Sequence, residues 1–276
     1  MPWHARLAVD YTLEAGRTVA RHRHEGPLRL LQSLYPEGDA SCHNVLIHPP
    51  GGLVGGDTLE INLHAGPGSH ALITTPGASR FYRSDGAWAR QLTRIRLDSA
   101  ARLEWLPLES LAYPGCLAEN RLQLDLAPEA EFIGWDITAL GLPDAGQPFE
   151  TGRWQQHIEC GGHWLERGLI DATDHRLLRS PLGLNGMACL ASLFFLSGSA
   201  LPRDRREALL ETARATLRAE GAPHPVGVTS PNPRVVVLRA LGERVEPCSA
   251  LLRRVWAAWR ASQWQVGTRA PRLWSL

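Results

Sequence analysis

Five acidic residues lie beside apolar segments of this sequence, and carboxylates in such positions could bind a divalent metal ion. They are Glu104, Glu109, Asp136, Glu166 and Asp171. Most acids at strand ends are solvated or paired with arginine. As a set lining a channel, however, they would supply hard oxygen ligands suited to weak, exchangeable metal binding. The sequence leaves both interpretations open.

A glycine-rich segment from His43 to Asp57 contains two Gly-Gly pairs after a Pro-Pro break. Glycine is used where φ is positive or where backbones approach closely. One interpretation is a sharp turn between strands, with Asp57 capping backbone amides. The other places Asp57, His43 and His48 beside an internal passage or metal-transfer point. The two histidines are five residues apart, on opposite faces of a strand, so we do not expect them to share one metal ion.

Several common catalytic motifs are missing from the sequence. The chain has no lysine, which removes the Walker A phosphate loop and Schiff-base chemistry. The glycines do not follow the dinucleotide-binding spacing, and neither a Gly-x-Ser-x-Gly elbow nor a His-Glu-x-x-His motif is present. We therefore do not expect an enzyme, although a triad dispersed along the chain leaves a small-molecule hydrolase as an alternative.

The segment from Thr74 to Ser84 has the composition of a protein interface. Arg80, Phe81, Tyr82 and Arg83 follow a Pro-Gly turn, and Arg and Tyr are enriched at binding hot spots. We expect these four residues to bind a partner protein, with an ordinary loop as the alternative.

Composition restricts the partners and the compartment. The formal net charge is +1, so no global field favours nucleic acid or an anionic membrane surface. The five cysteines are far apart and form no Cys-x-x-Cys pair, which indicates a reducing compartment. The N-terminus lacks the apolar region of a signal peptide, and the longest apolar stretch, 187–196, is too short for a membrane span. A cytoplasmic protein is expected.

Residues 7 to about 170 alternate apolar and other side chains, as half-buried strands do. A loose repeat of about thirty residues pairs two strands in each unit, beginning near Ile61, Ile95 and Leu124. Repeats of this size predict stacked β layers, in a solenoid or an elongated sandwich. With 26 glycines and 20 prolines marking turns, the fold class predicted is mainly β, a β-helix-like body.

The character of the chain changes after Ser180-Pro181. Residues 185–196 and 205–219 are predicted to be helices, 226–228 and 234–238 a strand pair, and Ser249 the cap of a last helix that runs to Trp264. We predict a β-rich body over 1–184 and a helical subdomain over 185–276 packed on it, with a soft boundary. Trp256 and Trp259 on the last helix are expected to contact a partner in part.

Long collinear motifs resemble those of the urease accessory protein UreD family, also called UreH. They include Ser33-Leu-Tyr-Pro36, the whole 43–57 segment, Thr75-Pro-Gly-Ala-Ser-Arg-Phe-Tyr-Arg-Ser84 and Leu103-Glu-Trp-Leu-Pro-Leu-Glu109, and they continue with Phe132-Ile-Gly-Trp-Asp-Ile137, Arg239-Ala-Leu-Gly242 and Pro271-Arg-Leu-Trp274. The resemblance covers the chain from near its start to its end.

This resemblance implies a maturation chaperone for the nickel enzyme urease, with a β-helix-like body and C-terminal helices. It implies binding to the accessory protein UreF, through UreF to the GTPase UreG, and to the urease apoprotein. It also implies an internal route for transient Ni²⁺, with no permanently bound cofactor. By position in the matching motifs the expected metal contacts are Asp57, Glu104, Glu109, Asp136 and Glu166. A pure protein-binding adaptor without a metal path remains the main alternative.

Overall fold

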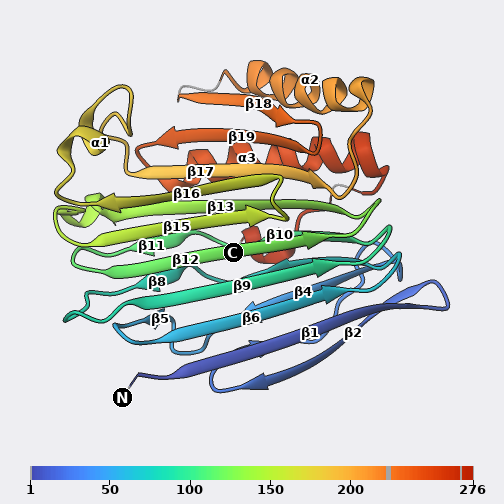
Figure 1. Ribbon diagram of the computed structural model, residues 1–276, viewed down its shortest axis with the longest axis horizontal. Helices are drawn as coiled ribbons and strands as arrows, with labels where there is room; N and C mark the ends of the chain where they lie inside the picture. Colours follow the sequence, from blue (N-terminus) through green and yellow to red (C-terminus); the bar gives the residue numbers. More distant parts are fainter. Residues whose placement is uncertain (1, 222–224, 268, 276) are drawn as a thin grey trace.

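The computed structural model describes residues 2–221, 225–267 and 269–275. Strands account for 48% of the chain and helices for 18%, arranged as a β-solenoid of about 4 turns with a C-terminal helix. The long strands run side by side across the body, and the C-terminal helices lie behind and above them in Figure 1. The expected fold class is confirmed.

Seven strands form one face of the solenoid, here called the A sheet. Its first two strands are an antiparallel hairpin, and β1 then begins a run of parallel neighbours that ends at β15. In spatial order the A sheet is β16 (Trp164–Asp171), β15 (Arg153–Cys160), β12 (Leu117–Leu126), β9 (Ala89–Leu97), β6 (Thr58–Ala65), β1 (His4–Glu14) and β2 (Arg17–Glu25).

The opposite face is a larger sheet, here called the B sheet. In spatial order its main path is β18 (Val226–Asn232), β19 (Val235–Gly242), β17 (Cys189–Ser197), β13 (Glu131–Leu142), β10 (Arg102–Leu106), β7 (His70–Thr74), β4 (Ser41–Ile47) and β3 (Arg29–Leu30). Short strands at the turns complete it, namely β5 (Gly52–Leu53), β8 (Ser79–Phe81), β11 (Ser110–Ala112) and β14 (Gln147–Pro148).

The strand register confirms the internal repeat. In the A sheet Leu63 pairs with Ile95, and Ile95 pairs with Leu124. In the B sheet Leu103 pairs with its counterparts in both neighbouring repeats. Each turn also contains a short third strand that the alternation did not predict, because two or three residues are too few to show a period. Equivalent residues therefore stack in rows that run across the strands.

The rows of apolar side chains between the two sheets form the larger core. Leu63, Ile95 and Leu124 from the A sheet meet Leu103 and Phe132 from the B sheet, and all five are 4% exposed or less. The alternate side chains of the A-sheet strands point away from this core, and this outer face is polar. This division between an apolar interior and a polar outer face is what the period of two predicts.

A second core lies behind the B sheet, where the C-terminal helices cover it. Leu72, Ile133 and Phe195 on the sheet pack with residues of α2 (Arg203–Glu220) and α3 (Val245–Trp259). The remaining helical segments are η1 (Pro143–Ala145), α1 (His175–Arg179), η2 (Arg260–Trp264) and η3 (Arg272–Ser275). Within the described residues, no helix combines the length and apolarity that crossing a membrane requires.

The predicted helix over 185–196 is wrong. Residues Cys189–Ser197 form β17, hydrogen-bonded on one side to β13 and on the other to β19. The strand is covered by the solenoid core on one face and by the helices on the other, so both of its faces are apolar. Such a short continuous apolar run carries no period that separates a strand from a buried helix.

Other expectations for the C-terminal third are borne out in part. The helix expected over 205–219 is present as α2, and the predicted strand pair is present as β18 and β19. The last helix begins at Val245 rather than at Ser249. Pro247 falls in its first turn, where the missing N–H has no intrahelical partner to lose. Strands β17 to β19 extend the same sheet as β13, so the expected division at 184/185 stays an interpretation.

Candidate functional site

Polar residues interrupt the apolar interior of the solenoid in one row of the A sheet. Gln91, Asn120 and Gln156 occupy equivalent inward positions on β9, β12 and β15, and the strand register places them side by side. Gln91 Nε2 donates to Asn120 Oδ1 at 3.4 Å. Buried amides need such partners because an unpaired one is costly. Three neighbouring turns therefore present amide groups to the interior at one level.

The B sheet presents a second polar row that meets the first. Asp136 on β13, Ser192 on β17 and Arg239 on β19 are aligned by register, with Asp136 and Ser192 half-buried and Arg239 exposed at the end of the row. Asn120 Nδ2 donates to Asp136 Oδ2 at 2.7 Å, which joins the two rows directly. We call these six residues together with Glu166 the inner polar rows, namely Gln91, Asn120, Gln156, Asp136, Ser192, Arg239 and Glu166.

Asp136 is the half-buried carboxylate of the inner polar rows. Burial raises the pKa of Asp136, and the nearby Glu166 charge raises it further. Hydrogen bonds from Gln156, Thr138 and Asn120 oppose the rise, and Thr138 Oγ1 lies 3.1 Å from Asp136 Oδ1. No guanidinium is among the groups that shift this pKa. Asp136 is held by neutral donors, and a cation that reached it would find a carboxylate without a fixed counterion.

One end of the inner polar rows meets a cavity. The cavity has a volume of about 390 Å³ and is lined by Gln91, by the loop that contains His48, and by the turn from Thr75 to Arg80. His48 Nε2 is buried and has no hydrogen-bond partner. Burial lowers the pKa of His48, and the Asp57 charge opposes this effect. The imidazole is thus a neutral base, the form that binds metal ions.

The other end of the rows lies at the edge strand of the A sheet. Gln156 pairs in register with Gly168, and nothing lies within 4 Å of where a Gly168 side chain would begin. Beside this open position, Glu166 is bound by the guanidinium of Arg239 at 2.7 Å. The inner polar rows therefore extend from the cavity to the surface at β16.

Asp57 performs the structural role that one interpretation predicted. It is 2% exposed, and its two carboxylate oxygens accept the backbone amides of Trp3 and Val54 at 3.1 and 3.0 Å. The glycines shape the same turn. Gly56 has a φ of +96°, and a side chain at Gly52 would collide with the Tyr82 ring.

Glu104 lies outside the inner polar rows, on the far face of the B sheet. It is fully buried, and its oxygens are held by His70 at 2.8 Å, Arg260 at 3.0 Å and Trp256 at 2.6 Å. Burial by itself would raise the pKa of Glu104, but the hydrogen bond from His70 and the Arg260 charge outweigh it and lower the pKa. Its acceptor positions are occupied by the contacts that dock the C-terminal helix.

Arg260 continues this ion network toward the N-terminal part of the chain. Its guanidinium binds Glu37 at 2.7 Å, and Glu37 in turn contacts His43 at 3.0 Å. Burial would raise the pKa of Glu37, but the hydrogen bonds from His43 and Arg260 lower it to about 2. His43 is therefore engaged in the helix junction rather than beside the cavity.

The five acids expected to contact metal are thus placed in four surroundings. Asp136 and Glu166 are brought together in the inner polar rows, whereas Asp57 caps a turn and Glu104 anchors a helix. Glu109 is half-buried beside a separate cavity of about 330 Å³. Across the described parts of the chain, no three His, Cys, Asp or Glu side chains are grouped to hold a metal ion together.

The residues expected to bind partners divide between surface and core. Arg80 and Arg83 are exposed, and Tyr82 is half-buried against Tyr113, with ring centres 4.8 Å apart. Phe81 is a core residue whose ring packs on Trp154.

Both helix tryptophans are also core residues rather than surface residues. Trp256 is 1% exposed and Trp259 is fully buried. The Trp259 indole donates to the Leu209 carbonyl at 2.9 Å, which ties α3 to α2. The expected partial exposure of these two side chains is therefore not observed.

Sequence reasoning missed the uncharged members of the site. Gln91, Asn120 and Gln156 occupy inward positions of otherwise apolar alternations, at equivalent points of successive repeats. A polar residue recurring on the buried side of a repeat is a readable signal. His48 was expected beside an internal passage together with Asp57 and His43, as one of two interpretations of the glycine-rich segment.

Comparison with known proteins gives one consistent result. The sequence profile of the family described as UreD urease accessory protein matches residues 4–275. A protein named urease accessory protein UreD from Variovorax paradoxus is 64% identical over 275 residues, covering 100% of both chains. Proteins of the same name from Albidiferax ferrireducens and Paracidovorax citrulli are 61% and 60% identical, again over 100% of both chains.

Proposed function

The chain belongs to the urease accessory protein UreD family, and we propose that it carries Ni²⁺ through its solenoid while holding urease and the other accessory proteins together. Proteins of this family are accessory proteins in the maturation of urease. In this role the chain binds UreF directly, is linked through UreF to UreG, and contacts the urease apoprotein in the cytoplasm. No catalytic step by the chain itself is included.

The observation that carries the proposal is the pair of facing polar rows of an otherwise apolar solenoid, in which Gln91 and Asn120 are buried and Gln156, Asp136 and Ser192 are half-buried. Burying polar groups is unfavourable, and a solenoid does not need them in order to stack. These rows meet a cavity at one end and an open edge strand at the other. Hydrogen bonds join Gln91 to Asn120 and Asn120 to Asp136 between these two openings, and polar groups placed in this way are what ion transfer would require.

The donor set suits passage rather than storage. Asp136 is a lone carboxylate surrounded by amides and hydroxyls, so it supplies one strong oxygen ligand. Each tenfold gain in affinity corresponds to about 1.4 kcal/mol, so a cage of several charged ligands would hold the ion too tightly to release it. In the proposed order Ni²⁺ meets the free His48 nitrogen first, then Asp136, and leaves past Glu166.

Partner binding is assigned to the surface residues beside the cavity. Arg80 lines the cavity, and Arg83 is exposed on the same segment. Arginine and tyrosine at such a site provide bidentate hydrogen bonds and a rigid contact surface. We assign Arg80, Tyr82 and Arg83 to this contact and leave Phe81, Trp256 and Trp259 in the core.

The test measures complex formation and nickel loading separately. Wild type, Asp136→Asn and the control Asp85→Asn, an exposed acid, are each co-expressed with UreF, UreG and urease. We expect all three to co-purify with UreF, and only Asp136→Asn to lower the nickel bound per urease. Full loading by Asp136→Asn within an intact complex would leave a bridging role without a metal path. Failure of wild type to co-purify with UreF would contradict the proposal itself.

A further inference from the structure

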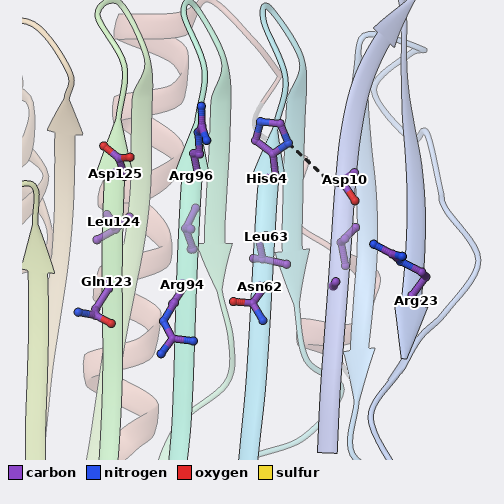
Figure 2. Close-up of a pocket in the computed structure, with 13 residues that line it drawn as sticks. Asp10, Arg23, Asn62, Leu63, His64, Arg94, Arg96, Gln123, Leu124 and Asp125 are labelled. Atoms are coloured by element: carbon purple, nitrogen blue, oxygen red, sulfur yellow. Dashed lines mark hydrogen bonds and ion pairs between the residues drawn. The ribbon is translucent and has the colours of Figure 1, made fainter. Parts of the chain in front are cut away.

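A shallow groove crosses the outer face of the A sheet, opposite to the face that carries the inner polar rows. Its volume is about 530 Å³, and it spans five strands from β2 to β12. Figure 2 shows the side chains that line it, standing on neighbouring strands that are parallel except for β2. Ala8, the smallest side chain of its row, lies between Arg23 and Asn62.

One row of the strand register forms the line of the groove. Arg23 pairs with Ala8, Ala8 with Asn62, Asn62 with Arg94, and Arg94 with Gln123. We call these five residues the donor row. It contains two guanidiniums and two amides and no acid. Among the described residues, neither Arg23 nor Arg94 forms an ion pair or a hydrogen bond.

In the two rows beside the donor row, the charged side chains are paired with side chains of opposite charge. On one side His64 lies between Asp10 at 3.3 Å and Asp98 at 2.8 Å, and Arg96 also contacts Asp98. Figure 2 shows Asp10, His64 and Arg96 along this rim, with Asp125 at its far end.

On the other side of the donor row, Arg6 binds Glu60, and Arg121 binds Glu119. Gln123 contacts Glu159, the next residue of the same row on β15, and Glu159 also binds His157. The two arginines of the donor row are thus uncompensated between two neutralised strips, and the row meets an acid beyond Gln123.

We propose that the donor row binds an extended acidic segment of a partner protein. Arg23 and Arg94 are three strand spacings apart, about 14 Å. An extended chain advances about 3.3 Å per residue and directs every second side chain to the same face, so carboxylates at positions i and i+4 match this span. Asn62, between the arginines, can donate to the backbone of the same segment.

The geometry disfavours nucleic acid as the occupant. A nucleic acid strand carries a charge about every 3.4 Å. Two isolated arginines would meet only two of those phosphates, and the others would face Asp10, Glu60 and Asp125. The net charge of +1 adds no wider attraction.

The test uses the full chain and a fluorescent extended peptide with aspartates at i and i+4. Binding is followed by anisotropy, against a peptide with aspartates at i and i+3 and one with asparagines. We expect saturable binding of the i, i+4 peptide, weakened about three- to tenfold by Arg94→Gln or Arg23→Gln, as expected for loss of one charge-assisted contact. Added salt should weaken it further.

Two further variants separate a shaped groove from a general charge effect. Ala8→Leu fills the groove without changing charge and should weaken binding as much as Arg94→Gln. Arg167→Gln removes an exposed arginine of the same sheet face that lies outside the groove and should leave binding unchanged. All variants are first checked for wild-type melting temperature. Equal binding of the i+3 peptide, equal loss in Arg167→Gln, no loss in Ala8→Leu, or tighter binding of a single-stranded oligonucleotide would each overturn the proposal.

Discussion

Asp136 is a carboxylate held inside the solenoid by neutral donors, and its raised pKa has a consequence for stability. Because the folded-state pKa of Asp136 lies above its ordinary value of 3.8, the folded protein loses stability as pH rises from that value through the folded pKa. Asp136→Asn does not titrate. We therefore expect its unfolding free energy to exceed that of wild type by an amount that grows with pH.

Urea unfolding of wild type and Asp136→Asn between acidic and neutral pH measures this difference directly. Asp85→Asn serves as the control, because Asp85 is exposed and its variant should track wild type at every pH. A difference for Asp136→Asn that stays constant with pH would show that this carboxylate does not titrate abnormally.

Glu104 is predicted to matter for folding rather than for nickel. Removing one member of a buried ion pair typically costs about 3–5 kcal/mol, because the partner charge is left uncompensated. Glu104→Gln leaves Arg260 and His70 with a neutral partner, so we expect a large loss of unfolding free energy. Glu109→Gln, at a half-buried position, should stay within about 1 kcal/mol of wild type. Equal stability of the two variants in thermal melts would contradict this assignment.

Asp57, Glu104 and Asp136 differ in how far their surroundings could be predicted from the sequence. The turn cap was one of the two interpretations given for Asp57, and it could be foreseen because a carboxylate after a glycine pair has a local partner within a few residues. Glu104 and Asp136 look alike in sequence, each beside a tryptophan. They differ because Glu104 faces the helices and Asp136 faces the interior, and that difference depends on contacts with residues far along the chain.

The junction of the C-terminal helix with the B sheet should be sensitive to acid. The hydrogen bonds from His43 and Arg260 lower the pKa of Glu37 to about 2, from an ordinary value of 4.5. A depressed pKa adds stability that is fully present above the unfolded value and is lost as pH falls through the folded one. We expect the junction to weaken between about pH 4.5 and pH 2.

Tryptophan fluorescence can follow this loss, because Trp256 and Trp264 lie in the junction. Glu37→Gln should be less stable than wild type at neutral pH and should lose less stability on acidification. An unchanged acid dependence in this variant would place the sensitive group elsewhere.

Among the strands, those with one buried face could be predicted from the sequence, whereas β17, with both faces buried, was predicted wrongly. Alternation identified the strands of the A sheet because their outer faces are polar. β17 is covered on both faces and was predicted to be a helix. The helix α2 was predicted correctly, because it keeps an exposed polar face.

For the whole molecule, the repeat of about thirty residues was enough to predict stacked β layers. It could not predict that the amides of three turns would align, since that depends on the register between strands that no local pattern fixes. It also could not show that β13 would bring Asp136 against Asn120. The inner polar rows are a property of the closed solenoid.

Nickel transfer in the presence of an external chelator tests the central claim most directly, because an enclosed route protects the ion. Nickel-loaded UreG is the only metal source, and urease loading is followed over time for two variants of adjacent residues. Gln156 faces the interior and Gln155 faces the outside of the same strand.

We expect chelator-resistant loading by wild type and by Gln155→Leu. Gln156→Leu should transfer about tenfold more slowly or worse, since it removes a hydrogen-bond partner of Asp136, while the complex still assembles. Loss of wild-type transfer to the chelator, or equal rates for the two variants, would contradict an internal route along the inner polar rows.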